Sequence, residues 1–420
     1  MEKTVYILGA GFSKPAGFPL QGDLLRSVLD EAGEDILRLS GDILSAPDAP
    51  SDDIRRDREI IRKFTDASFP SREHVQLEDV FTLLDQVILE RAHFVKFPEK
   101  ELREIRSAWV RAILFTLHQT SEQHLKGSNM RHRAIAAALI EQRIGANITG
   151  DPFSIISLNW DSLVEDSIYW VLKEVGAFRD GKALADIDYC VYTTPLPKSA
   201  HTASTKQKSC HIYNIKLLKM HGSSTWLRCP CSNLVYTGLG MNESAHDIYV
   251  KSKVSPFIED HLDEREKDSP SILEPFIITP TFTKVFDLPH IQTTWHNAFV
   301  ELREADQVVF IGYSLPDADY HFRTLLRRAI RSKTPVKVIL DASAEPPKNL
   351  LTADPKTVYP AQRYRQVFRE EQLTFNYKGV EGFAKEFAPE EQLPTALERI
   401  KNTFLAYPPL PQPVPITTEA

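Results

Sequence analysis

Residues 4–8, Thr-Val-Tyr-Ile-Leu, form a short run that is apolar on both of its alternating faces, and the run ends at Gly9-Ala10-Gly11. A strand that is apolar on both faces must be covered on both faces, which is typical of the central strand of a parallel sheet. Glycines directly after such a strand allow a tight turn and a close approach of the backbone to a ligand. This segment therefore predicts a parallel α/β sheet with a binding loop at its edge.

The same strand pattern recurs along the chain, in each case ending in polar or glycine-bearing residues. The further predicted strands are 154–158, 215–220, 307–311 and 336–340, and residues 276–278 are expected to return to the same core. Segments of helical periodicity, such as 295–302 and 319–331, stand between them. This alternation predicts an α/β fold with a Rossmann-like, doubly wound parallel sheet.

The domain organisation follows from the same reading. Residues 1–345 are expected to form one catalytic domain, in which about 20–150 is a large helical insertion between the first two strands. We expect residues 346–405 to form a C-terminal helical and strand extension. Residues 406–420 are rich in proline and predict a linker or docking tail.

Composition excludes several classes of protein. The net charge of −7 disfavours direct binding to nucleic acid or to acidic membranes, so contact with nucleic acid is expected only through a partner. No apolar run approaches the roughly 20 residues of a membrane-spanning helix. The N-terminus is expected to start a buried strand instead of a signal peptide. Four cysteines predict no disulfide framework, and we expect a cytoplasmic protein.

The predicted strands carry their most distinctive residues at their C-terminal ends, where open α/β sheets bind ligands. A lone Asn159 more often caps a turn, and a lone His221 is more often a core histidine. Four polar strand ends converging on one edge are instead typical of a site. The candidate site residues are Gly9, Ala10, Gly11, Phe12, Ser13, Asn159, Asp161, His221, Gly312, Tyr313, Ser314 and, more weakly, Asp341.

The order of these motifs resembles the sirtuin family. Gly-Ala-Gly-x-Ser at 9–13 is followed by Asn-x-Asp at 159–161, His-Gly-Ser at 221–223 and Gly-x-Ser-Leu at 312–315. In particular, the order is similar to that of the bacterial sirtuin-like NAD hydrolases of anti-phage defence systems. The resemblance covers most of residues 4–343 but neither the insertion nor the C-terminal segment.

The resemblance implies a role for each motif. The loop 9–13 would hold the NAD phosphates, and Asn159 would orient the nicotinamide ribose and the attacking water. Asp161 would lie behind Asn159 or near the nicotinamide, and His221 would be the catalytic histidine. Residues 312–314 would line the adenosine half, and Asp341 is a candidate contact to the adenine ribose. NAD is then a substrate, and no metal is expected.

The residue types suit the cleavage of the nicotinamide–ribose bond. The reaction develops oxocarbenium character on the ribose, so the site needs oriented dipoles and a base that works near neutral pH. A histidine, with an ordinary pKa of about 6.5, can take a proton from a ribose hydroxyl or from water. The amide of Asn159 can hold a water and a hydroxyl without titrating.

Departures from the family pattern favour a hydrolase over a protein deacylase. Deacetylating sirtuins carry a four-cysteine zinc module, but here Cys229-Pro230-Cys231 has no second pair downstream, and Cys190 and Cys210 lie upstream. Leu158 stands where deacetylases have glutamine, and 14–20 lacks their acidic, aromatic and basic residues. The alternatives are an NAD-dependent deacylase and a non-catalytic nucleotide-sensing module.

An NAD hydrolase that is always active would kill its host, so its activity must be controlled. The chain shows no obvious sensor domain. We therefore expect control by homo-oligomerisation or by a separate activating protein, such as a ring ATPase or an Argonaute-like protein. The use of NADP and the cyclisation of ADP-ribose both stay open.

Other sequence signals are given plainer interpretations. Glu78 and Asp79 open a helix and are expected to complement its dipole, the alternative being a catalytic carboxylate from the insertion. Charged residues at 55–63 and basic residues at 323–337 are expected to form solvated faces. Trp226 and Trp295 are candidates to cover the pocket, although tryptophans are commonly core residues.

Overall fold

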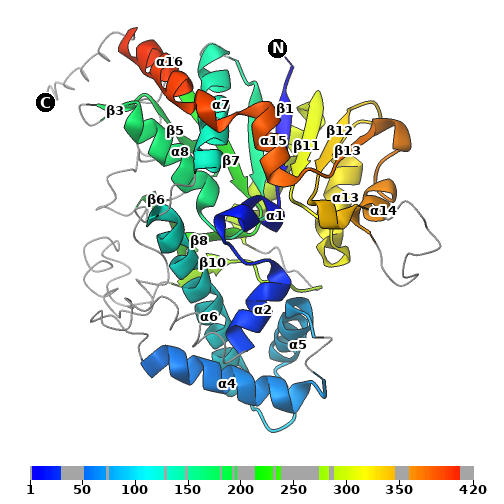
Figure 1. Cartoon of the computed structure of the whole chain (residues 1–420). Coiled ribbons are helices and arrows are strands. Elements are labelled where there is room, and N and C mark those ends of the chain that lie inside the picture. The colour runs from blue at the N-terminus through cyan, green and yellow to red at the C-terminus, as the bar shows by residue number, and fades with distance from the viewer. Residues whose placement is uncertain are drawn as a thin grey trace, which may run out of the picture.

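The computed structural model describes residues 2–29, 52–71, 75–126, 130–146, 150–179, 182–191, 194–195, 213–229, 233–237, 274–282, 288–345 and 359–406. Within these residues the central sheet has seven strands in the order β13-β12-β11-β1-β2-β7-β5, and every neighbouring pair is parallel (Figure 1). The strands are β1 (Thr4–Leu8), β2 (Phe153–Ser157), β5 (Ala185–Asp188), β7 (Tyr213–Lys219), β11 (Gln307–Ile311), β12 (Val336–Ile339) and β13 (Leu373–Asn376).

Strand β1 lies at the centre of this sheet and is covered on both faces, as its sequence predicted. Val5 and Ile7 belong to the hydrophobic cluster on one face, and Tyr6 and Leu8 belong to the cluster on the other. Side chains alternate across a strand, so a strand between two helical layers buries apolar side chains on both of its faces.

Helices pack on both faces of the sheet, which confirms the predicted α/β, doubly wound class. Helices α12, α13 and α14 lie on the face buried by Val5, and α7, α8, α15 and α16 lie on the other (Figure 1). Their bounds are α7 (Met130–Gly145), α8 (Leu163–Glu174), α12 (Pro289–Glu304), α13 (Tyr320–Ala329), α14 (Pro360–Arg365), α15 (Gly379–Phe387) and α16 (Leu393–Ala406).

Several helices from the segment predicted as an insertion lie together beside the sheet layers (Figure 1). They are α2 (Gln21–Leu29), α4 (Asp52–Ser68), α5 (Leu77–Leu89) and α6 (Glu99–Lys126), and both α4 and α5 pack against α6. Helix α7 also falls within residues 20–150, but it packs against α8 on the sheet.

A second, smaller sheet contains the segment that was expected to return to the core. Strand β10 (Glu274–Ile277) pairs antiparallel with β8 (Gly222–Arg228), Phe276 is buried, and Ile277 packs against the main core cluster. The residues after His221 therefore start a strand and not only a loop. The order is β10-β8-β9-β6, with β9 (Val235–Thr237) and β6 (Thr194–Pro195).

Short elements complete the described fold. Strands β3 (Phe178–Arg179) and β4 (Lys182–Ala183) pair with each other. Short helices are α1 (Ala10–Ser13), η1 (Lys14–Ala16), η3 (Asp317–Asp319), η4 (Ala342–Ala344), η6 (Glu370–Gln372) and η7 (Glu390–Gln392). Within the described part of the chain, no helix has the length and apolar character needed to cross a bilayer.

The C-terminal segment expected as an extension contributes directly to the main sheet. Strand β13 forms the sheet edge beside β12, and α16 packs on α7. Residues 346–358 and 407–420, which include most of the proline-rich tail, lie outside the described residues.

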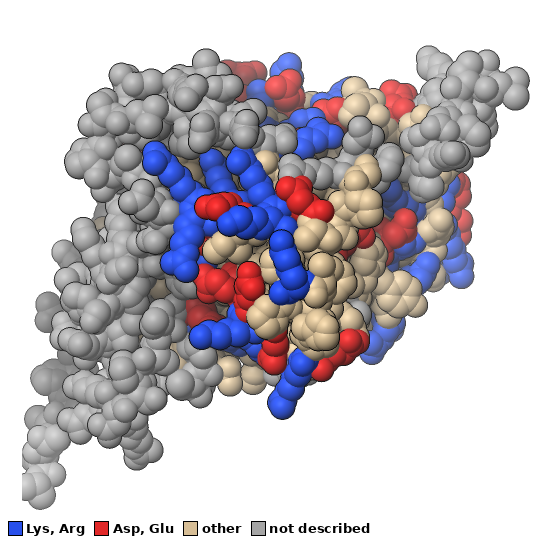
Figure 2. Space-filling view, turned by 90° about the horizontal axis from the view of Figure 1, so that it is seen from below, with Lys and Arg blue, Asp and Glu red and all other residues tan. Residues whose placement is uncertain are grey.

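The face formed around α4 is charged, with Lys and Arg side chains interspersed with Asp and Glu (Figure 2). Arg55 and Arg56 are exposed, in line with the predicted solvated helix face. Asp57 differs from that prediction, because it is buried and pairs with Arg111 of α6, whose Nε lies 2.6 Å from Oδ2. This ion pair joins α4 to α6.

Candidate active site

Three glycines bring the loops after β1 and β11 into direct backbone contact. A Cβ atom on Gly9 would lie 2.6 Å from the Cα of Tyr313, and one on Gly11 would lie 2.8 Å from the Cα of Gly312. Gly312 has a φ of +66°, and a Cβ there would lie 2.2 Å from the nitrogen of Phe12. Only glycine fits these positions. The contact between the two loops therefore requires the three glycines whether or not a ligand binds there.

The loop after β1 divides its residues between the cavity and the core. Gly9, Ala10 and Gly11 line the cavity. Phe12 and Ser13, which the sequence grouped with them, are buried and are not among its lining residues. Phe12 instead packs against the ring of His132, whose Nε2 hydrogen-bonds to the Phe12 carbonyl at 2.9 Å.

Asn159 follows β2 and is oriented by the loop after β1. Its Nδ2 donates to the carbonyl of Gly9 at 2.9 Å and to Oγ of Ser13 at 3.1 Å. Ser13 therefore acts through Asn159 from behind the cavity wall. With the amide nitrogen held in this way, the amide oxygen is the group of Asn159 that can accept a hydrogen bond from a ligand.

His221 follows β7, is buried and lines the same cavity. Its Nδ1 lies 3.2 Å from the carbonyl oxygen of Leu158. Because a carbonyl only accepts hydrogen bonds, Nδ1 carries the proton in this contact and Nε2 is the basic nitrogen of the neutral ring. The loop that carries Asn159 therefore sets the tautomer of His221.

Asp161 lines the cavity with an almost fully buried carboxyl group. One oxygen accepts from the amide of Leu163 at 3.1 Å, in the first turn of α8. Burial raises the pKa of Asp161, while the charge of Lys219 and a hydrogen bond with Ser13 oppose that shift. The carboxyl group thus links α8 to the loop before it.

The loop after β11 forms the other side of the cavity. Gly312, Tyr313 and Ser314 all line it. The Tyr313 hydroxyl donates to Asp319 at 2.8 Å, and the carbonyl of Tyr313 accepts from the hydroxyl of Tyr364 at 2.8 Å. These bonds anchor the loop on both of its sides.

Asp341 lies at the end of β12, on the cavity wall. Its Oδ1 accepts from the backbone nitrogen of Ser343 at 3.1 Å and from the Ser343 hydroxyl at 2.8 Å. These two hydrogen bonds hold the pKa of Asp341 below its ordinary value. An ionised carboxylate is therefore presented at this end of the cavity.

One cavity of about 720 Å³ collects these groups at the carboxyl edge of the sheet. Small-molecule sites in proteins span roughly 300–1,000 Å³, so a dinucleotide-sized ligand fits this volume class. The predicted residues that line it are Gly9, Ala10, Gly11, Asn159, Asp161, His221, Gly312, Tyr313, Ser314 and Asp341. The topology thus brings four distant motifs to one place.

The insertion also contributes a carboxyl group that our preferred sequence interpretation missed. Asp79 has the expected helix-end role, since its carboxylate accepts from the backbone nitrogen of Gln76 at 2.9 Å. Glu78 is instead buried and lines the cavity together with Gln21. Burial raises the pKa of Glu78, and the charge of Asp319 adds to the shift. The helical pattern placed Glu78 at a helix start but could not show which way it faces.

The tryptophan that lines the cavity differs from the two that were suggested as its covers. Trp226 is buried against Phe276 in the second sheet, and Trp295 donates to the carbonyl of Met220 at 3.2 Å. Neither lines the cavity. Trp160 does, and its Nε1 donates to the carbonyl of Ile278 at 3.1 Å.

The basic stretch at 323–337 is also less uniform than expected. Arg323 is buried and pairs with the carboxylate of Asp317 and the side-chain oxygen of Gln366. It therefore belongs to the packing of α13 and not to an exposed basic face.

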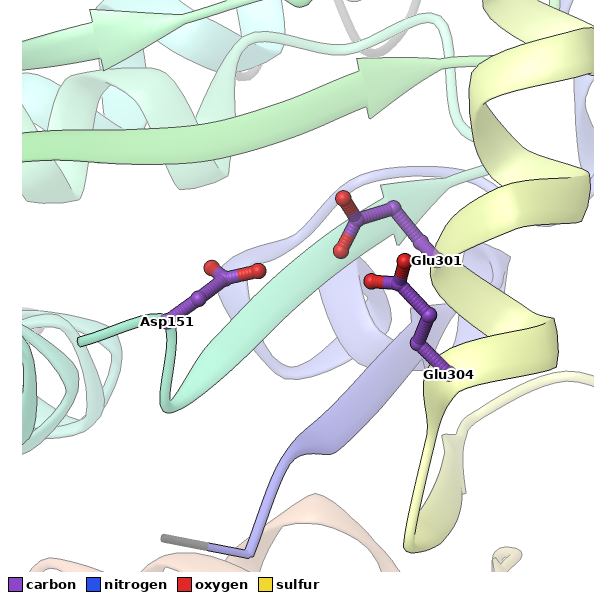
Figure 3. A group of neighbouring side chains, drawn as sticks. All are labelled: Asp151, Glu301 and Glu304. Carbon is purple, nitrogen blue, oxygen red and sulfur yellow. The ribbon is translucent and has the colours of Figure 1, made fainter. Parts of the chain in front are cut away.

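A cluster of three carboxylates, Asp151, Glu301 and Glu304, has the spacing of a possible metal site (Figure 3). The Nζ of Lys3 lies 2.6–2.9 Å from an oxygen of each carboxylate, and the Nζ of Lys216 lies 2.8 Å from Asp151 and Glu301. Two lysines thus already compensate most of the negative charge of the cluster. It lies where β1 and β2 begin, at the edge opposite the cavity, so it has a structural role.

The cysteine pattern is only partly described. Within the described part of the chain, neither Cys190 nor Cys229 takes part in a disulfide bond, and Cys210 and Cys231 lie outside the described residues. Burial raises the pKa of the Cys190 thiol, so this group carries no reactive thiolate near neutral pH.

No protein-family model matches the chain, and no curated protein matches it. Solved structures similar to it include Sir2 enzymes. One, from work on Sir2 mechanism and regulation, is 14% identical, with 96% of this chain and 93% of that chain covered and a TM-score of 0.34. A Sir2 complex with a peptide and NAD+ is 14% identical, with 91% and 90% covered and a TM-score of 0.36.

A Sir2 homologue in complex with ADP-ribose is 12% identical to this chain. The match covers 97% of this chain and 95% of that chain, with a TM-score of 0.34. These TM-scores are low, so the fold rests on the strand order and the site rests on the contacts given above.

Proposed function

We propose that this protein is an NAD glycohydrolase, which cleaves NAD to nicotinamide and ADP-ribose. The observation that carries the proposal is that Asn159 and His221 line the same cavity as the glycine loop and the loop after β11. Amides and glycines at strand ends suit a pyrophosphate, and an oriented amide beside a histidine suits cleavage at the ribose.

The residues support a division of labour in the reaction. The backbone around Gly9 and Gly11 would bind the phosphates, and the carboxylate of Asp341 would accept a hydrogen bond from a hydroxyl of the adenine ribose. The amide oxygen of Asn159 would orient the nicotinamide ribose and a water. Nε2 of His221 would accept a proton from the ribose hydroxyl or from that water, because Nδ1 is held by Leu158.

The test measures nicotinamide release from NAD by the full chain, with and without an acetyl-lysine peptide. We expect release without peptide, and its loss by at least ~100-fold in Asn159→Ala and in His221→Ala. The exposed residues His296 and Asn402 supply matched controls, and their alanine variants should keep wild-type activity. Release that needs the peptide would instead identify a deacylase, and ADP-ribose binding without any cleavage would identify a nucleotide-sensing module.

We propose in addition a biological role, which rests on the family resemblance of the motifs. The protein would deplete NAD in the cytoplasm during phage infection, as an effector of an abortive defence system. Its activity would be controlled by homo-oligomerisation or by a separate ring ATPase or Argonaute-like protein, which would also supply any contact with nucleic acid. A purified monomer with full activity would contradict this control.

A further inference from the structure

A buried lysine lies directly behind the candidate active site and has no place in the proposed chemistry. Lys219 is the last residue of β7 and is fully buried. Its neighbours Leu218 and Met220 face one core cluster, so the alternation of the strand turns Lys219 towards the opposite face, where α8 packs. A buried ammonium group is costly unless it is paired and hydrogen-bonded.

Lys219 makes two contacts, and they differ in kind. Its Nζ lies 3.0 Å from Oε1 of Glu165 in α8, which compensates its charge. The same Nζ donates at 2.6 Å to the main-chain carbonyl of Asp161. The second contact is made to the loop that carries Asn159, while Lys219 itself lies two residues before His221 in the chain.

The segment 219–224 binds three main-chain carbonyl groups of this loop. His221 bonds to the carbonyl of Leu158, the backbone nitrogen of Ser224 donates to the carbonyl of Trp160 at 2.7 Å, and Lys219 holds that of Asp161. The loop is therefore anchored on both sides of Asn159, and Lys219 is the charged anchor.

We propose that Lys219 is a positioning residue, which fixes the loop of Asn159 and Asp161 relative to His221 through its bond to the Asp161 carbonyl. The inference rests on the proposed function. A buried ion pair can often be replaced by apolar residues without loss of stability. The direct bond to the loop gives this lysine a function that an apolar pair would lack. The positive charge of Lys219 also favours the ionised form of the Asp161 carboxyl group.

Three variants separate positioning from simple ion pairing. Glu165→Gln removes the charge of the partner but leaves Lys219 bonded to the Asp161 carbonyl. Lys219→Met removes the bond and leaves Glu165 buried without its cation. The double variant Lys219→Met/Glu165→Gln removes the bond but also relieves that unpaired carboxylate, so it should recover stability lost by Lys219→Met alone.

We expect the double variant to lower kcat for nicotinamide release by ~100-fold, because small misplacements of reacting groups have effects of this size. Glu165→Gln should keep kcat within ~3-fold of wild type. The affinity for ADP, which lacks both the nicotinamide and its ribose, should change by less than ~2-fold in either variant. Equal kcat values in Glu165→Gln and the double variant would overturn the proposal.

Amide hydrogen exchange of residues 158–163 tests the same inference without catalysis. Exchange in the double variant should be faster than in Glu165→Gln at matched global stability, since only the double variant lacks the bond to the loop. Equal exchange would overturn the positioning role. If wild type neither binds NAD nor releases nicotinamide but the exchange rates differ as expected, the proposed function fails and the role of Lys219 stands.

Discussion

Asp166 offers a quantitative test of the electrostatics beneath the site. Its carboxyl group is buried in α8 and accepts from the hydroxyl of Ser162 at 2.9 Å. Burial raises the pKa of Asp166 to about 8, and the nearby carboxyl groups of Glu165 and Asp161 add to the shift. In the unfolded chain the same group has a pKa of about 3.9. Between these values the folded protein holds a proton that the unfolded chain has released.

The folded state therefore loses stability as the pH rises through 8. Linkage gives the size: for a folded pKa of about 8 and an unfolded chain that is already ionised, raising the pH from 6 to 9 costs roughly 2.5 kcal/mol. Asp166→Asn has no carboxyl group to ionise there. We expect the free energy of unfolding of Asp166→Asn, minus that of wild type, to grow by about that amount between pH 6 and pH 9.

The assay is urea unfolding of both proteins at a series of pH values between 6 and 9, followed by circular dichroism. Asp23→Asn, at an exposed position in α2, is the control and should follow the wild-type curve. The reasoning is refuted if the wild-type and Asp166→Asn curves run parallel, because Asp166 would then be ionised in the folded protein already at pH 6.

Two further predictions follow from the packing. Gly312→Ala places a Cβ 2.2 Å from the nitrogen of Phe12 at a φ of +66°, so it should separate the two loops and lower the affinity for ADP-ribose at least ~10-fold by calorimetry. Gly145→Ala, where nothing lies within 4 Å and which does not line the cavity, should bind normally. Lys3→Met leaves the buried Glu301 with Lys216 alone and should lower the free energy of unfolding by roughly 3 kcal/mol in urea, with NAD binding unchanged. A loss below about 0.5 kcal/mol would contradict the structural role of that cluster.

The central layer and the position of the candidate site were both predictable from the sequence. The run Thr4–Leu8 is apolar on both faces, which only a covered central strand satisfies, and the structure buries it between two helical layers. Parallel strands end at the same edge of a sheet. The motifs that follow β1, β2, β7 and β11 therefore had to meet, and Asn159 and His221 line one cavity.

The second sheet and the true cavity wall depended on contacts between distant segments. Residues 276–278 have the pattern of any buried strand, and only their pairing with β8 assigns them to the smaller sheet. Glu78 and Asp79 are adjacent acids at one helix start. The docking of α5 against the rest of the fold turns Glu78 into the cavity and leaves Asp79 as the cap.

Lys219 shows most clearly which features depend on the local sequence and which depend on tertiary packing. Strand periodicity predicts that its side chain lies on the face opposite Leu218, and this position depends on local geometry alone. Its bonds to Glu165 and to the carbonyl of Asp161 join residues 54 and 58 positions away in the chain. Such contacts exist only once β2, β7 and α8 are packed together, because burial then leaves the ammonium group no water to bind.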